Sequence, residues 1–324
     1  MIRRIIILAC LLLAAQHSVA SDFDFSISDG ISNSKLKEKM EKNVISMLSI
    51  FNSREVSMKF MKKGITEDAR ICISELLQNT TIKYSSVTSS SCIKTISGYQ
   101  IRGVPVNFES ADYEEAGQNL TIDFTPDGDI SNVSVSIGED RYNQIMAEMS
   151  TQEDYVRRQR IVSFVEQFRT AYNRKDMPFL QDVYSDKALI ITGSVRNCME
   201  RQSFGDDVSL INKETVVYLK QTKQQYLTNL QRVFNRNEFI NISFEDVDIV
   251  QHPKYDDIYG VTIKQKWHSS HYYDEGYLFL MIDFRNSERP LIQVRTWQPY
   301  KNSSGEVILK KENVFHLGSF HIVR

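Results

Sequence analysis

The chain has 324 residues, of which 25% are charged, 41% are apolar and 10% are aromatic. This composition is typical of a globular protein with a substantial core, and it excludes disordered and collagen-like chains. Lys and Arg total 39 and Asp and Glu total 41, with no long run of either sign, so we expect no basic face for nucleic acid. The length suggests two domains.

The first twenty residues have the pattern of a secretory signal peptide. Arg3-Arg4 precedes an apolar stretch over residues 5–15, and the small residues of Ser18-Val19-Ala20 suit signal peptidase. We predict cleavage after this triplet and a signal peptide over residues 1–20. A lipoprotein reading built on Cys10 is the alternative. The apolar stretch is shorter than the ~18 residues that span a bilayer, and no later segment reaches that length, so we expect no membrane span.

A polar leader, residues 21–34, precedes an N-terminal α+β domain that we place at 35–149. Apolar residues at helical spacing predict a first helix around Met40 to Phe51. Thr66 is expected to cap a second helix, because its hydroxyl can accept from the first turn and two acidic residues follow it. This helix should end at Asn79.

Strands rich in β-branched and aromatic residues follow these helices. The sequence Pro126-Asp127-Gly128-Asp129 predicts a tight turn into a strand that begins at Ile130, which makes a β-hairpin. A short helix over residues 141–149 closes the first domain.

Three cysteines remain after the predicted cleavage: Cys72, Cys92 and Cys198. In an oxidising compartment an odd number leaves at most one pair, and Cys72 and Cys92 share the N-terminal half, so we predict a disulfide between them. Three unpaired thiols are the alternative, because the sequence does not give the separation that a disulfide needs.

The second domain, placed at 150–324, begins with a helix whose apolar stripe runs from Ile161 to Tyr172. Asp176 should cap a short helix with a proline in its first turn. A short buried strand is expected over 188–192, and the polar, aperiodic segment Val195 to Lys213 predicts a long loop.

A further helix from about Thr222 to Asn235 leads into four apolar runs that are separated by polar or turn-forming residues. Their length and β-branching predict four strands, over residues 239–250, 259–267, 277–284 and 291–297.

Several segments of the second half resemble the nuclear transport factor 2-like superfamily, and more closely its secreted members from Gram-negative bacteria. The similarity covers about residues 155–300 and rests on the segments Phe168 to Asp176, Leu189 to Gly193, Lys223 to Leu230, Gly276 to Phe284 and Ile292 to Pro299. The resemblance implies a cone of helices packed on a curved antiparallel sheet, with a pocket, in a periplasmic or extracellular protein. The superfamily includes ketosteroid isomerases, scytalone dehydratases and members without catalysis, so the fold does not fix the function.

The N-terminal domain has a helix that matches this pattern in part. Val44, Met47, Leu48 and Phe51 precede Ile161, Phe164, Val165 and Phe168 at one constant offset. A degenerate internal copy and an unrelated domain therefore both remain open. The predicted fold class is α+β throughout.

Asp283 is the candidate general base. Enzymes of the superfamily move protons with Asp, His or Tyr in an apolar cavity, where burial raises the pKa of a carboxyl. Asp283 follows Tyr277 on an apolar row of its strand, and Tyr172 or Tyr277 would donate a hydrogen bond to the substrate. The alternative, which we favour, is an ion pair of Asp283 with Arg285 or Arg295 at the rim.

Arg295 and Trp297 share a face of the last predicted strand and are candidates to bind an anionic, planar ligand. The alternative is a solvated arginine stem that covers a tryptophan at an interface. His268, His271, Asp274 and Glu275 have the wrong spacing for one strand face, so we expect no metal. The sequence contains no glycine-rich phosphate loop, and no cofactor is expected.

Both rows of the strand 277–284 are apolar, which predicts that it is buried on two sides. We expect Leu278, Leu280 and Ile282 to form an interface, either with the first domain or in a homodimer.

These observations favour an exported, non-enzymatic binding or assembly protein whose pocket takes a small ligand or whose surface takes an envelope protein. The alternative is a lyase or isomerase that acts on a small apolar substrate with Asp283 as base.

Overall fold

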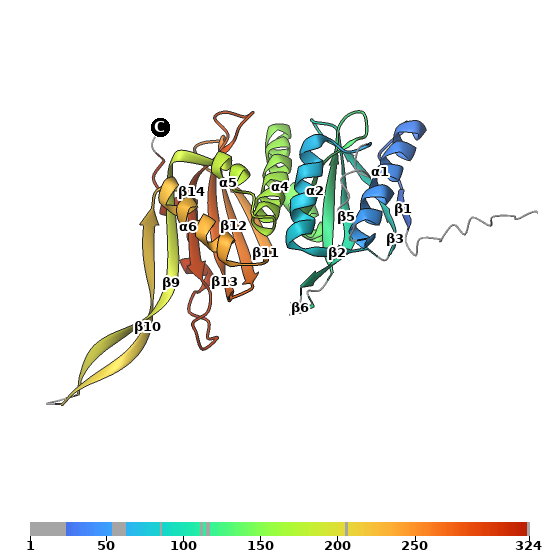
Figure 1. Ribbon diagram of the computed structural model, residues 1–324. Coiled ribbons are helices and arrows are strands. Elements are labelled where there is room, and N and C mark those ends of the chain that lie inside the picture. The colour runs from blue at the N-terminus through green and yellow to red at the C-terminus, as the bar shows by residue number, and fades with distance from the viewer. Residues whose placement is uncertain are drawn as a thin grey trace, which may run out of the picture.

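The computed structural model describes residues 24–53, 63–84, 86–110, 113–114, 117–204 and 207–322. The predicted signal peptide lies outside these residues. Within them the chain is mixed α+β, as predicted, with helices and two large sheets in two halves (Figure 1).

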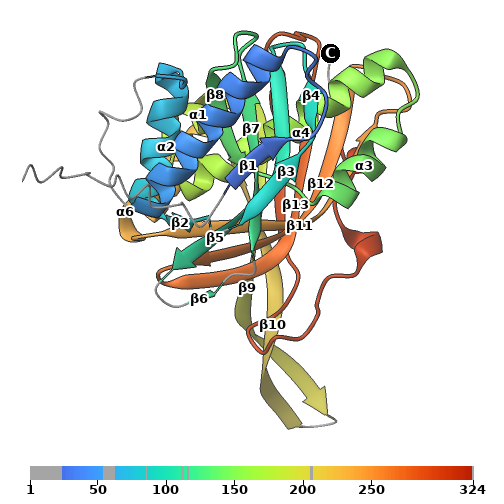
Figure 2. The same cartoon turned by 90° about the vertical axis from the view of Figure 1, so that its right-hand side faces the viewer.

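The N-terminal half packs two helices, α1 (Ser34–Ser53) and α2 (Glu67–Asn79), on an antiparallel sheet. The sheet has the order β2 (Thr81–Lys83), β5 (Tyr99–Ser110), β7 (Gln118–Phe124) and β8 (Ile130–Val135), with β4 (Cys92–Lys94) and β6 (Tyr113–Glu114) also paired to β5. Figure 2 shows α1 and α2 side by side on this half.

Two local predictions for this half are confirmed. The Thr66 hydroxyl accepts a hydrogen bond from the Ala69 amide at 3.3 Å and caps α2. The β7–β8 hairpin turns at the predicted site, where Gly128 has a φ of 84° that favours glycine. The expected polar leader, in contrast, contains a short strand, β1 (Asp24–Ile27), which pairs with β3 (Val87–Ser90) and buries Phe25 and Ile27.

The C-terminal half wraps a six-stranded sheet around three helices, α4 (Gln152–Asn173), α5 (Met177–Val183) and α6 (Lys223–Arg236). Neighbouring strands are antiparallel except β14 and β9, which are parallel. The strand order is β10 (Asp207–Gln221), β9 (Tyr184–Phe204), β14 (Leu291–Pro299), β13 (Tyr272–Asp283), β12 (Ile258–Ser269) and β11 (Ile240–Gln251).

This arrangement is the cone of helices on a curved sheet that the sequence resemblance implies. The apolar stripe of α4 lies inside it: Ile161 and Val165 are fully buried and belong to one cluster with Leu278 and Leu280 of β13. The C-terminal half therefore has the architecture expected from that resemblance.

The predicted loop over residues 195–213 is wrong. β9 and β10 pair without a register shift from Phe204↔Asp207 to Ile190↔Gln221 and form a long hairpin that runs out from the body (Figure 1). Ser194 and Arg196 are exposed, so no buried apolar row marks the strand in the sequence. Gly193 lies within β9, where a Cβ would stand 2.9 Å from atoms of Pro299 and Tyr218.

Helix α4 joins the two halves. Its Thr170 hydroxyl accepts a hydrogen bond from the Val135 amide of β8 at 2.9 Å, and α3 (Glu139–Ala147) contributes Tyr142 and Ile145 to the core of the C-terminal half. Arg102 of β5 pairs with Glu166 of α4, and both side chains are buried. The first domain thus packs on α4, and its helix α3 also contacts β11 of the C-terminal sheet, where Arg141 donates to the Val247 carbonyl.

The predicted interface residues do not lie on the outer face of the sheet. Leu278, Leu280 and Ile282 face the helices inside the cone. The opposite row of β13 is also buried, because the C-terminal segment folds back over it: Phe320 stacks on Phe279 with ring centroids 5.6 Å apart, and Leu317 joins the same cluster. The chain itself covers this face.

The predicted disulfide is not formed. Cys72 and Cys92 are free thiols, and they lie in different surroundings: Cys72 on α2 near Arg174, and Cys92 buried beside Gly30. The side chain of Cys198 lies outside the described residues.

None of the helices in the described ranges is long and apolar enough to cross a membrane.

Candidate functional site

A cavity of about 560 Å³ opens between the sheet and α6, within the size range of small-molecule sites. Both tryptophans of the sequence, Trp267 and Trp297, line it. Tyr226 and Leu230 of α6 form the opposite wall, because the apolar stripe of this helix faces the sheet. The mouth carries exposed apolar side chains, with Leu219 56% exposed.

Arg295 is the buried charged group of the cavity wall, whereas the two other arginines that line the cavity, Arg196 and Arg236, are exposed. Its place on β14, opposite Leu280, directs it to the helix side of the sheet, and its side chain is 7% exposed. The guanidinium carbon lies 4.7 Å from the centroid of the Tyr226 ring. Within the described chain, Nε and Nη1 are buried and have no hydrogen-bond partner.

Three tyrosine hydroxyls surround this guanidinium. The Tyr172 hydroxyl lies 2.6 Å from that of Tyr226 and 3.5 Å from that of Tyr184. Burial raises the pKa of Tyr184 and Tyr226 well above the usual range, so both rings stay neutral. Tyr184 and Tyr226 therefore offer Arg295 dipoles and a π face, but no negative charge.

Asp274 is the carboxyl of the cavity wall. Its Oδ2 accepts hydrogen bonds from Trp297 Nε1 at 3.1 Å and from the Tyr272 hydroxyl at 2.8 Å. Burial outweighs these bonds and raises the pKa of Asp274. The sequence analysis considered Asp274 only as a metal ligand. Its even-numbered position, in step with Leu278 and Leu280, is the signal that places it on the cavity face.

The structure brings three of the predicted site residues together and separates two. Tyr172, Arg295 and Trp297 lie at the cavity or directly behind its wall. Tyr277 lies on the outer face of the sheet, where its ring packs edge-on against Tyr300. Tyr277 cannot contact a ligand in the cone.

Asp283 also lies on the outer face, which overturns its assignment as general base. It lines a separate cavity of about 550 Å³ beneath the C-terminal segment. Arg285 donates to it from Nε at 2.7 Å and from its backbone amide at 2.9 Å. Burial would raise the pKa of Asp283, but the hydrogen bonds from Arg285 outweigh burial and lower it. The alternative of a pair with Arg285 is the one that the structure shows.

No group of three or more potential metal ligands occurs among the residues that the structure describes. His268 packs against Phe239, with ring centroids 5.3 Å apart, and Asp274 is engaged by Trp297 and Tyr272.

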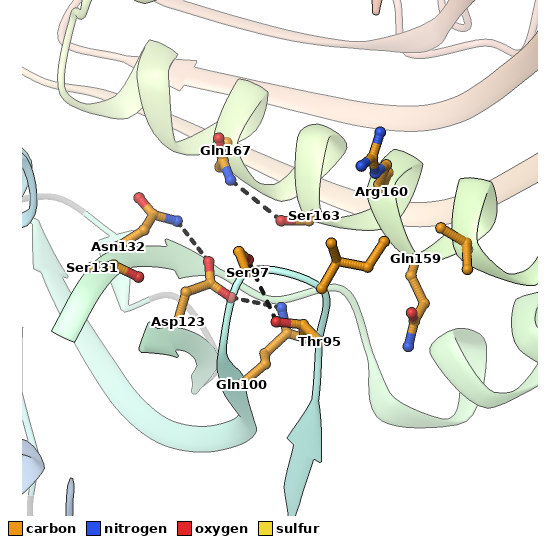
Figure 3. Close-up of a pocket in the computed structure, with 12 residues that line it drawn as sticks. Thr95, Ser97, Gln100, Asp123, Ser131, Asn132, Gln159, Arg160, Ser163 and Gln167 are labelled. Carbon is orange, nitrogen blue, oxygen red and sulfur yellow. Dashed lines mark hydrogen bonds between the residues drawn. The ribbon is translucent and has the colours of Figure 1, made fainter. Parts of the chain in front are cut away.

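A further cavity, of about 360 Å³, lies between the two halves. Figure 3 shows Asp123 on one wall, with Ser163 and Gln167 of α4 opposite. Asp123 accepts hydrogen bonds from Gln100 at 2.8 Å and from Asn132 at 3.1 Å. Asp123, unlike Arg295, has hydrogen-bond partners of its own, so this cavity is less suited to a ligand.

Comparisons with known proteins give structural matches alone. No family model and no curated protein matches the chain. Among solved structures, protein Bd1075 of Bdellovibrio bacteriovorus aligns at 13% identity over 66% of this chain and 76% of its own, with a TM-score of 0.34. An NTF2-like protein from Cytophaga hutchinsonii aligns at 12% identity over 44% of this chain and 97% of its own, with a TM-score of 0.32.

A third match is a candidate scytalone dehydratase from Novosphingobium aromaticivorans. It aligns at 7% identity over 44% of this chain and 84% of its own, with a TM-score of 0.32. Likenesses this weak do not say what this chain binds or does.

Proposed function

We propose that this chain is an exported protein that binds a small molecule in the cone cavity and does not transform it. The observation that carries the proposal is the cavity wall, which combines two tryptophans with a buried guanidinium that has no counter-ion among the residues that the structure describes. Such a wall suits recognition of a ligand by stacking and charge. The carboxyl expected to act as base, Asp283, is held by Arg285 on the other face of the sheet.

The experiment uses the tryptophans as reporters. Because both tryptophans of the sequence line the cavity, a bound ligand should change the intrinsic emission. The purified protein is incubated with fractions of a bacterial extract, washed, and denatured, and the released compounds are identified by mass spectrometry. We expect one retained compound that alters the emission of the native protein. Retention of nothing, with unchanged emission for every fraction, would contradict the proposal.

Export is proposed from the signal-peptide pattern of residues 1–20. Expression of the full chain in a Gram-negative host should yield periplasmic protein. Its intact mass should equal that of a chain that begins at Ser21. A cytoplasmic protein that retains Met1 would overturn this part of the proposal.

A second function, proton transfer by Asp274, is favoured by one observation. Asp274 is a partly buried carboxyl of raised pKa in the cavity wall, which is a feature of general acids and bases. If it acts on the ligand, the retained compound should take up deuterium in heavy water with the wild-type protein and not with Asp274→Asn. Equal uptake with both proteins would exclude this role.

A further inference from the structure

We infer that the ligand of the cone cavity is an anion, in the first place a carboxylate with an apolar or aromatic body, and that Arg295 binds its charge. The inference rests on the proposed function, since it assigns the chemistry of the same cavity. It begins from a comparison of Arg295 with the other buried arginines of the chain.

Five arginines are buried among the residues that the structure describes. Arg102 pairs with Glu166, Arg158 with Asp154, and Arg174 with Asp176. Arg169 donates to the backbone carbonyls of Ile242 and Ser136 and to the Gln118 side chain. Each of these four guanidiniums therefore has carboxylate or carbonyl oxygens as acceptors, which is what a buried cation requires.

Arg295 has neither. Its interactions are with the Tyr226 ring and the Tyr172 hydroxyl, and its Nε and Nη1 donate to nothing in the described chain. A guanidinium stays protonated in proteins, so it cannot relieve its burial by losing charge. A permanent cation with buried, unused donors at a cavity wall is therefore a site for an acceptor with negative charge from outside the chain.

The acidic group of the cavity wall does not fill this role. Asp274 has two donors of its own, Trp297 and Tyr272, on a single oxygen. Its raised pKa shows that its surroundings favour the neutral form, the opposite of what a close salt bridge to Arg295 would produce. The cavity wall thus keeps one buried positive charge, that of Arg295, while Arg196 and Arg236 at the same cavity are exposed to water, and this buried charge calls for a negative charge on the ligand.

The remaining wall specifies the body of the ligand. Trp267, Trp297 and Leu230 offer aromatic and aliphatic surface to the same space. Their surface suits a planar or aliphatic skeleton, which buries apolar area against it. A carboxylate on an apolar skeleton matches both parts of the wall.

The test compares acids with amides of the same shape. Binding of 2-naphthoate, indole-3-acetate and decanoate, and of their three amides, is measured by calorimetry and tryptophan emission at low salt. We expect at least one acid to bind about tenfold or more tightly than its amide, because a charge-assisted hydrogen bond inside the cavity replaces a neutral one. Arg295→Met should remove this preference, and Arg295→Lys should retain part of it.

Arg289→Met is the matched control, since Arg289 is exposed and outside the cavity wall. It should leave the preference unchanged. Stability gives a second readout: without ligand, Arg295→Met should be at least as stable as the wild type, because it removes a buried charge that no carboxylate compensates.

Two results would overturn the inference: no acid preferred over its amide in the wild type, or a preference that survives in Arg295→Met. A ligand retained from the extract that carries no negative charge would overturn it while leaving the proposed function intact. If the extract yields no ligand while acids bind through Arg295, the proposed function would be contradicted and the inference would stand.

Discussion

Asp274 and Asp283 lie on the same strand, β13, yet their pKa values shift in opposite directions. Residues of even number on this strand face the helices, as Leu278 and Leu280 do, and residues of odd number face the C-terminal segment. Asp274 therefore loses water in the cavity wall, and its pKa rises by burial. Asp283 meets Arg285, whose hydrogen bonds outweigh burial, and its pKa falls.

This opposition predicts opposite pH dependences of stability. Above the usual Asp pKa of about 4, folded Asp274 holds its proton more tightly than the unfolded chain does, so its contribution to stability falls as pH rises toward its folded pKa. Folded Asp283 holds its proton less tightly, so its contribution is present above that usual value and is lost as pH falls below it.

The measurement is urea unfolding from about pH 3 to 7 of the wild type, Asp274→Asn and Asp283→Asn. Relative to Asp274→Asn, the wild type should lose stability as pH rises. Relative to Asp283→Asn, it should gain stability over the acidic part of the range. Differences that do not depend on pH, or that have the reverse signs, would contradict the assignment of the two faces.

The residue scale also shows where prediction from sequence ends. Because both rows of β13 are apolar, the pattern could show that the strand is buried on two sides but not which row faces the helices. The choice of Asp283, Tyr277, Leu278, Leu280 and Ile282 for the site and the interface followed from that ambiguity. Arg295 and Trp297 were found because they share a row on the neighbouring strand.

At the scale of elements, the caps at Thr66 and Asp176 were predicted because a cap depends on neighbouring residues, whereas at Thr222 only the start of the helix was predicted. Thr222 accepts from the Gln225 amide at 3.2 Å, while the Gln225 side chain accepts from the Thr222 amide at 2.9 Å. This capping box begins α6, which carries Tyr226 and Leu230 to the cavity. The outer part of the β9–β10 hairpin was missed because described side chains there, such as Ser194 and Arg196, are polar and exposed.

The cap of α6 gives a prediction at this scale. Thr222→Ala should lower the free energy of unfolding by about 1 kcal/mol, because it leaves a first-turn amide without its acceptor. Thr228→Ala, the same change on the exposed side of the same helix, should be neutral or slightly stabilising. Equal effects of the two substitutions, measured by urea unfolding, would contradict the role of the capping box.

The C-terminal segment gives a second prediction at the scale of elements. Leu317→Ala should destabilise the protein by about 2 kcal/mol, because it uncovers part of the outer row of β13. Val307→Ala, at an exposed position nearby in the sequence, is the control and should have little effect. If Leu317→Ala were equally silent, the segment would not cover the sheet in solution.

At the scale of the whole molecule, α4 serves both halves. One side of the helix fills the cone, and the other side meets β8 and β5 of the N-terminal half through Thr170 and Glu166. The sequence predicted the division into halves from its length and composition. It gave no sign of the joint, because the pair of Arg102 with Glu166 links residues 64 positions apart.

This joint is open to a direct test. Arg102→Met should lower the free energy of unfolding by about 3 to 5 kcal/mol, because it leaves Glu166 buried with an uncompensated charge. Glu153→Gln breaks an exposed pair with Arg157 on the same helix and should change stability by less than about 0.5 kcal/mol. A small effect of Arg102→Met would show that the halves do not meet as described.

The central claim is that Arg295 presents unused donors to a ligand in the cone. Nitrogen-15 NMR of arginine side chains measures this most directly, with the Arg295 Nε–H signal assigned by its loss in Arg295→Lys. On addition of an acid that binds, this signal should shift downfield as the proton enters a charge-assisted hydrogen bond, and the matching amide should produce no such shift. An Arg295 signal that is unmoved by a bound acid would contradict the account.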